Sequence, residues 1–248
     1  MKSEQVLLGL LALAALVAGC DRARRGEAPP LEAPYAARQV WAVAPLRNES
    51  GSLQADGVVI ADHLARQLEN ARPIDMVPVN RVLAAMDALE MPAVASPQDA
   101  QRLRRLLEVD GLIVGTVTAY EPYDPPKLGI AVELYLSPPD EPFPVLDVRR
   151  LSSAATDQWT QPDPPPGARS PASVVSGFYD AADPGVRGAL EQYARYRGIR
   201  GQGAENPHLY RMSMDLYTEF VSYLVSSRLL QAESQRLAPP AGSDPTSP

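Results

Sequence analysis

The sequence predicts an α/β domain built around a mixed β-sheet, with further helices near the C-terminus packed on it. Segment Asp110–Tyr120 is nearly continuous in apolar residues and rich in Val, Ile and Thr, which suits a central strand buried on both faces. Segment Leu128–Leu136 alternates strictly between two sets of residues, as a strand with one face on the core does. Strand and helix patterns alternate before both segments, which favours the α/β class. The later strands follow one another as a β-meander, so we expect them to be antiparallel.

The first half of the domain supplies the remaining strands and most of the helices. The predicted elements are strands at 38–46 and 74–79, a turn at 48–52, and helices at 53–71, 80–89 and 97–108. Asn80 is expected to cap the second helix, and Ser96 followed by Pro97 is expected to open the third. In that third helix we expect Leu106 to face the core and Arg104 to face solvent.

The second half is predicted to complete the sheet and then to become helical. A weaker third strand of the meander is predicted at 145–152. Two helices follow, at 183–197 and 206–235. Apolar residues of the last helix recur at spacings of three, four and seven, so we expect this helix to dock on the sheet domain. The alternative is that this stripe is a partner-binding face. The residues of this stripe are Met212, Leu216, Phe220, Tyr223 and Leu230.

Proline content sets the boundaries between these parts. The 26 prolines of the 248-residue chain concentrate near the N-terminus, in the middle and at the C-terminus, which favours linkers and tails there. The predicted organisation is a signal peptide at 1–19, a disordered tether at 20–37, the α/β domain at 38–158, a Pro-rich loop at 159–182, a helical extension at 183–235 and a disordered tail at 236–248.

The N-terminus has the features of a bacterial lipoprotein signal peptide. Lys2 gives a positive start, and residues 6–17 are almost purely Leu, Ala, Val and Gly, a stretch too short for a comfortable membrane span. It ends in the letters LVAGC, which resemble the lipobox at which bacterial lipoproteins are lipidated and cut. We therefore predict removal of residues 1–19 and a lipid anchor on Cys20, the only cysteine. An ordinary core cysteine or a secretory signal is the alternative.

A lipid on Cys20 would attach the mature protein to a membrane of the cell envelope, facing the periplasm. No thiol would then remain for a disulfide, a redox centre or a metal site. Asp21 follows the anchor, and in enterobacterial lipoproteins an aspartate at this place favours retention in the inner membrane. Asp21 otherwise merely begins a charged tether, so inner and outer membrane both stay open.

Charge and composition argue against nucleic acid as a partner and against catalysis. The net charge of −7 offers no basic stripe for a phosphate backbone. His63 and His208 are the two histidines, and neither has a second ligand at helical spacing, so both are interpreted as surface or cap residues. The serines show no G-x-S-x-G pattern. We predict no catalytic residue, no cofactor and no metal.

Three other groups of residues have plainer explanations than chemistry. Gly111 and Gly115 lie inside a predicted strand, where close packing explains them better than a nucleotide loop. The letters GIRGQG at 198–203 could hold a phosphate or a carboxylate, although a loop between helices is the stronger interpretation. The remaining carboxylates considered form no recognisable acid–base pair; they are Glu133, Asp147 and Asp157.

Segments at 43–51, 55–68, 74–89 and 100–117 resemble a group of envelope proteins. The group contains the amino-terminal domain of TolB, the curli-secretion lipoprotein CsgG, and LpoB-like activators of penicillin-binding proteins. The resemblance covers about a third of the chain and implies a core like the anticodon-binding domain. It further implies a non-catalytic docking or assembly module for other envelope proteins and leaves a homo-oligomer open. The alternatives are a subunit of an oligomeric CsgG-like secretion channel and, third, an envelope hydrolase.

Overall fold

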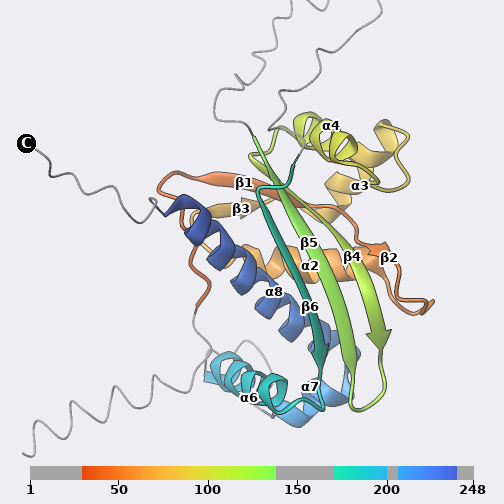
Figure 1. Ribbon diagram of the computed structural model, residues 1–248, viewed down its shortest axis with the longest axis vertical. Coiled ribbons are helices and arrows are strands. Elements are labelled where there is room, and N and C mark those ends of the chain that lie inside the picture. Colours follow the sequence, from red (N-terminus) through yellow and green to blue (C-terminus); the bar gives the residue numbers. More distant parts are fainter. Residues whose placement is uncertain (1–29, 138–169, 200–205, 239–248) are drawn as a thin grey trace, which may run out of the picture.

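The computed structural model describes residues 30–137, 170–199 and 206–238, and it shows a mixed six-stranded sheet with helices on both faces (Figure 1). The strands are β1 (Gln39–Val43), β2 (Arg47–Asn48), β3 (Ile74–Met76), β4 (Gly111–Glu121), β5 (Lys127–Leu136) and β6 (Ser173–Asp180). Their order is β3-β1-β4-β5-β6, with β2 paired to β4. The pairs among β1, β2, β3 and β4 are parallel, whereas β5 is antiparallel to both β4 and β6. The predicted fold class is confirmed.

Local sequence explains where the helices begin. The described helices are α2 (Gly57–Leu68), α3 (Val79–Ala88), α4 (Pro97–Leu107), α6 (Pro184–Ile199), α7 (Pro207–Met212) and α8 (Met214–Leu237). Asp56 accepts backbone N–H bonds from the first turn of α2, so this helix begins later than the predicted residue 53. Ser96 caps α4 as predicted. The expected cap at Asn80 is wrong, because α3 already begins at Val79 without a side-chain cap.

One face of the sheet, here called the closed face, is covered by α2 and α8 (Figure 1). Apolar side chains of β5 at alternate positions pack there with the aromatic residues of α8 and α6. Tyr193 of α6 lies with its ring centroid 4.9 Å from that of Tyr223 and 5.6 Å from that of Phe220. Because Phe220 is fully buried in this cluster, the predicted docking of the last helix on the sheet domain is confirmed.

The other face is covered by α3 and α4 over part of its length only. Leu112 and Tyr135 of the sheet pack with Leu103 of α4 in a second, smaller core. Arg104 is buried here and donates hydrogen bonds to Gln101 and to the Val109 carbonyl, contrary to the prediction that it faces solvent. Leu106, expected inside, is 48% exposed. The Arg104 guanidinium donates to a carbonyl just beyond the end of α4, whereas a leucine has no donor to offer it.

Two element boundaries also differ from the predictions. Strand β6 lies within 159–182, which was predicted to be a loop. The helix predicted at 206–235 is two helices, because Ser213 ends α7 and its hydroxyl accepts a bond from the Leu216 N–H to start α8. Met212 consequently leaves the buried stripe and lies exposed.

The predicted tether at 20–37 includes residues that belong to the domain, because residues 30–37 follow the surface of the domain. Leu31 is buried, and the Tyr35 ring stands edge-on to that of Trp41, with centroids 5.5 Å apart. The Tyr35 hydroxyl donates to Glu233 near the end of α8. The signal peptide, Cys20, the strand expected at 145–152 and the tail from residue 239 lie outside the described residues. Among the described helices, none has the length and apolar character needed to cross a bilayer.

Candidate functional site: an open sheet face

The two histidines lie on different helices and have different surroundings. His63 is buried on α2, not at the surface, and its Nε2 lies 2.8 Å from Oδ1 of Asp215 on α8. This contact joins the two helices of the closed face, so it is a structural link. His208 is exposed in the first turn of α7, as predicted. Within the described ranges, no cluster of His, Cys, Asp and Glu could hold a metal ion.

The other sequence candidates are equally separate. A Cβ at Gly111 would lie 2.8 Å from the Trp41 ring, so close packing explains this glycine. Arg197 at the end of α6 pairs with Glu219 of α8 at 2.8 Å, and residues 200–205 of the glycine-rich loop lie outside the described residues. Asp147 and Asp157 also lie outside them. Glu133 accepts a 2.6 Å hydrogen bond from the Tyr135 hydroxyl.

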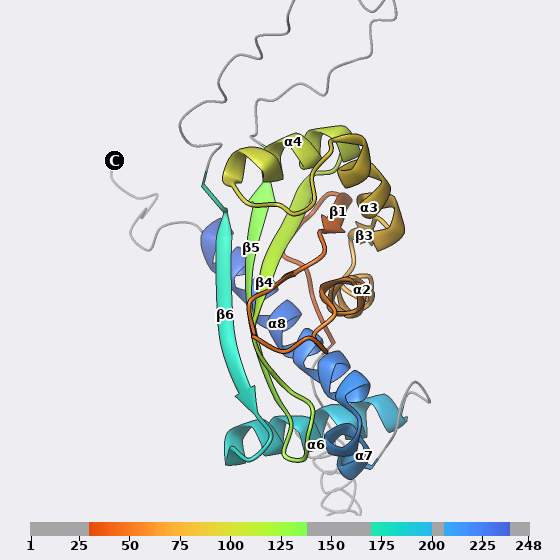
Figure 2. The same cartoon turned by 90° about the vertical axis from the view of Figure 1, so that its right-hand side faces the viewer.

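The sequence did not reveal a stretch of sheet that no described element covers, here called the open face. It is the side of β4, β5 and β6 opposite α8, beyond the reach of α3 and α4. The register places Thr116, Ala131 and Ser176 in one row across it, and Gly129 beside Phe178. In Figures 1 and 2, α3 and α4 lie over the upper part of this face, and no described helix covers its lower part.

A hollow of about 360 Å³ lies where the open face meets the start of α4. Its apolar lining includes Val114 and Val174, and its polar lining includes Ser96, Thr116 and Glu133. Burial, followed by the hydrogen bond to Glu133, raises the pKa of Tyr135, so this hydroxyl remains a donor. The Tyr135 hydroxyl donates to Glu133 and the Ser96 hydroxyl donates to Asp99, so these two hydroxyls of the lining already have acidic partners.

Strand β6 forms one edge of the sheet and lacks the usual protection of an edge strand. Edge strands are ordinarily blunted by lysine, proline or a bulge, because their free N–H and C=O groups can pair with another chain. From Ser173 to Tyr179 the strand carries no charge and no proline. Val174 is 57% exposed and Phe178 is 60% exposed on the open face. This edge therefore has the chemistry of a strand-addition site.

The opposite edge of the sheet is protected, which makes the contrast informative. Strand β3 has three residues and lies between Pro73 and Pro78. Its Asp75 forms an ion pair with Arg38 at the surface.

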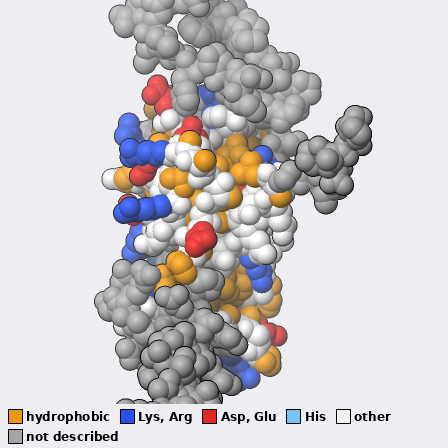
Figure 3. All heavy atoms as spheres, turned by 90° about the vertical axis from the view of Figure 1, so that its left-hand side faces the viewer, with side chains coloured by type: hydrophobic (Ala, Val, Ile, Leu, Met, Phe, Trp, Pro, Cys, Tyr) orange, Lys and Arg blue, Asp and Glu red, His pale blue; other side chains and the backbone are white. Residues whose placement is uncertain are grey.

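Basic and acidic side chains are also intermixed on the face shown in Figure 3, where no patch of one sign stands out. The alternation of residues in SVVSGFYD was the sequence signal that could have revealed β6.

Comparison with known proteins finds distant likenesses only. No protein-family model matches the chain, and no curated protein matches it by sequence. The LpoB C-terminal domain from Salmonella enterica is similar over 41% of this chain and 74% of its own, with 14% identity and a TM-score of 0.34. Lipoprotein GNA1162 from Neisseria meningitidis is similar over 57% and 80%, with 14% identity and a TM-score of 0.31. The hypothetical protein CT253 from Chlamydia trachomatis is similar over 80% and 94%, with 12% identity and a TM-score of 0.34. Likenesses this distant do not assign a function.

Proposed function

We propose that this chain is a lipid-anchored, non-catalytic envelope protein that docks another envelope protein along the open face. The observation that carries the docking proposal is the unprotected edge strand β6, with Val174 exposed at the hollow and Phe178 exposed further along the strand. The lipobox-like letters before Cys20 support the anchor. The anchor would confine the search for a partner to the envelope.

The geometry suits an extended segment of the partner added beside β6. Main-chain hydrogen bonds along β6 would provide affinity, and side chains at alternate positions would provide specificity. One such side chain would enter the hollow beside Val174, and another would cover Phe178. The two charged residues that line the hollow already have protein partners, since Glu133 accepts from Tyr135 and Arg47 pairs with Glu49. An uncharged partner strand therefore fits this edge best.

The alternative of a secretion channel is weakened by the position of its candidate strand. A membrane barrel needs strands of roughly ten residues with one apolar side facing lipid. Strand β5 has the length, but Leu128, Ile130 and Leu134 on its apolar side are buried against the helices of the closed face. Such a barrel would require this strand to leave the core.

Photocrosslinking in the native envelope tests the docking site. A benzoylphenylalanine at position 178 should give a discrete heavier product, and the same group at Leu106 of α4, another exposed apolar position, should not. Adding Ser176→Lys should suppress the product, because a lysine on an edge strand opposes pairing. Equal products at both positions, or no product at 178, would contradict docking here. A product with twice the mass of the chain would identify a second copy as the partner.

The anchor is tested separately. Cells expressing the Cys20→Ser variant should show no label from an alkyne fatty acid on this protein, and the protein should leave the membrane fraction. An unlabelled variant that remains in the membrane fraction would refute the anchor without affecting the docking site.

A further inference from the structure

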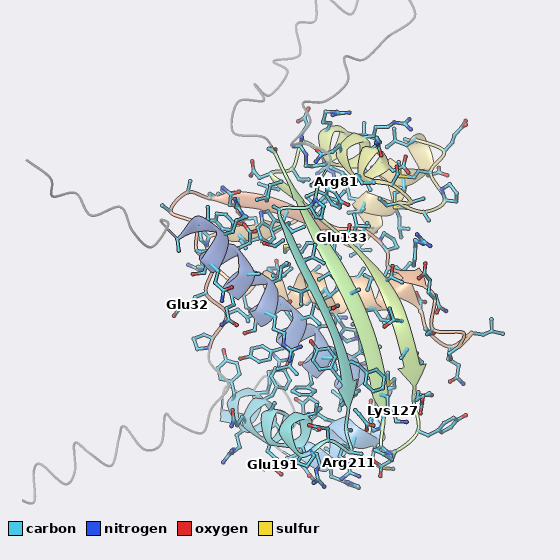
Figure 4. The ribbon with its side chains drawn as sticks, in the orientation of Figure 1. Glu32, Arg81, Lys127, Glu133, Glu191 and Arg211 are labelled. Carbon is cyan, nitrogen blue, oxygen red and sulfur yellow. The ribbon has the colours of Figure 1, made fainter. Side chains whose placement is uncertain are left out.

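The described chain begins beside one end of the molecule, formed by α6, α7 and the tip of the β4–β5 hairpin (Figures 1 and 2). Pro30 lines a hollow of about 110 Å³ together with Tyr196 and Arg197 of α6. Arg211 of α7 binds Asp124 of the hairpin through two hydrogen bonds of 2.7 and 3.1 Å, which ties these elements together. Figure 4 shows Lys127, Glu191 and Arg211 at this end and Arg81 near the opposite end.

Three large apolar side chains are exposed on these joined elements, and they are here called the apolar end. Tyr123 next to Asp124 is 77% exposed. Met212 next to Arg211 is 61% exposed, and Leu209, one turn earlier in α7, is 46% exposed. Tyrosine and aliphatic residues together are typical of surfaces that rest in the headgroup region of a bilayer.

The length of chain between the proposed anchor and the domain limits how far this end can lie from the membrane. Residue 30 follows residue 20 by ten positions, and ten residues span at most ~35 Å when fully extended. Asp21 follows the anchor, and Arg22, Arg24 and Arg25 come next; arginines this close to a membrane surface are attracted to anionic headgroups. Because Pro30 lies beside the last turns of α6, a tether of this length allows the end that carries α6 and α7 to reach the lipid.

We propose that the apolar end rests on the bilayer surface, so that Tyr123, Leu209 and Met212 contact lipid. This inference rests on the proposed lipidation of Cys20. It also gives the docking site an orientation. Strands β4, β5 and β6 run along the long axis of the molecule (Figure 1), so β6 would extend away from the membrane and present its free edge to a partner.

The single cysteine of the chain makes a clean test possible. Once Cys20 carries lipid, a new cysteine is the only free thiol. Tyr123→Cys, Met212→Cys and, as a matched control at the far end, Leu106→Cys would each be labelled with an environment-sensitive NBD dye. The full lipidated protein would be reconstituted into vesicles of phosphatidylethanolamine and phosphatidylglycerol that contain nitroxide-labelled lipid.

We expect a blue shift and nitroxide quenching of the dye at 123 and 212, with neither change at 106. Equal behaviour at all three positions, or unquenched dye at 123 and 212, would overturn the proposal. A mass spectrum of the same protein distinguishes a missing anchor from a missing contact with lipid. A protein without acyl chains refutes the anchor, whereas an acylated protein with unquenched dyes refutes only the contact with lipid.

Discussion

The two faces of the β4–β5–β6 sheet differ in what covers them. On the closed face, the 24-residue helix α8 buries Phe220 and its aromatic neighbours completely. On the open face, α3 and α4 cover only part of the sheet and leave Phe178 exposed. Both faces carry apolar side chains on regular strands, so strand pattern alone does not decide which face becomes core. Burial on the closed face stabilises the fold, whereas the open face leaves apolar side chains exposed to solvent.

The largest loss of stability should follow truncation of a buried side chain on the closed face. Phe220→Ala removes a fully buried ring that packs against Tyr193 and Tyr217, and the cavity adds to the lost burial. We expect a loss of about 3–5 kcal/mol in the free energy of unfolding. Urea denaturation followed by circular dichroism measures it. A change below about 1 kcal/mol, the range usual for surface positions, would show that α8 is not part of the cooperative core.

A smaller loss of stability should follow overpacking between the neighbouring strands β1 and β4. In Gly111→Ala the new methyl would lie 2.8 Å from the fully buried Trp41 ring, so the ring or the backbone would have to shift. We expect destabilisation of about 1–3 kcal/mol. The matched control is Gly188→Ala in α6, where nothing lies within 4 Å and alanine should stabilise by about 0.4–1 kcal/mol. Similar effects of the two substitutions in thermal unfolding would refute the packing argument.

A pH-dependent effect is expected where the N-terminal segment meets both β6 and α8. Burial raises the pKa of Glu233, but hydrogen bonds from Arg236, Ser173 and Tyr35 outweigh burial and hold this pKa below its ordinary value. A carboxylate with a lowered pKa stabilises the fold above its unfolded pKa of about 4.3, and that stabilisation disappears as the pH falls through the folded value. Native Glu233 should therefore be more stable than Glu233→Gln at pH 7.

The difference between these two proteins should shrink as the pH falls below about 4.3. Denaturant midpoints measured across that range provide the comparison. A difference that stays constant with pH would mean that Glu233 is not charged in the folded protein. Ser234→Ala, at the neighbouring exposed position of α8, is the control and should show no pH-dependent difference.

The sequence was sufficient for elements whose signal is local and periodic. The buried run of β4, the alternation of β5 and the Ser96-Pro97 start of α4 were predicted because each is determined by neighbouring residues. The break at Ser213 was missed because the apolar spacing from Met212 to Leu216 continues across it. Strand β6 was missed because its eight residues follow a Pro-rich stretch that dominated the interpretation.

The candidate site depended on packing that no local pattern contains. Val174 and Phe178 have the alternation of an ordinary amphipathic strand, and only the positions of α3 and α4 decide that they stay uncovered. The buried state of His63 likewise depends on α8, which lies more than a hundred residues later in the chain. Long-range packing therefore decides which apolar side chains of the sheet become core and which stay exposed.

The smallest effect on stability should come from the same truncation on the open face. Phe178→Ala removes a ring that is 60% exposed and borders Gly129, so little apolar area is lost and no closed cavity forms. We expect a change within about 0.5 kcal/mol, as for surface positions, in the assay used for Phe220→Ala. Crosslinking from a benzoylphenylalanine at position 174 should nevertheless fall, because the ring would contact the partner. If Phe178→Ala instead costs as much as Phe220→Ala, the chain itself covers this face, and docking must occur elsewhere.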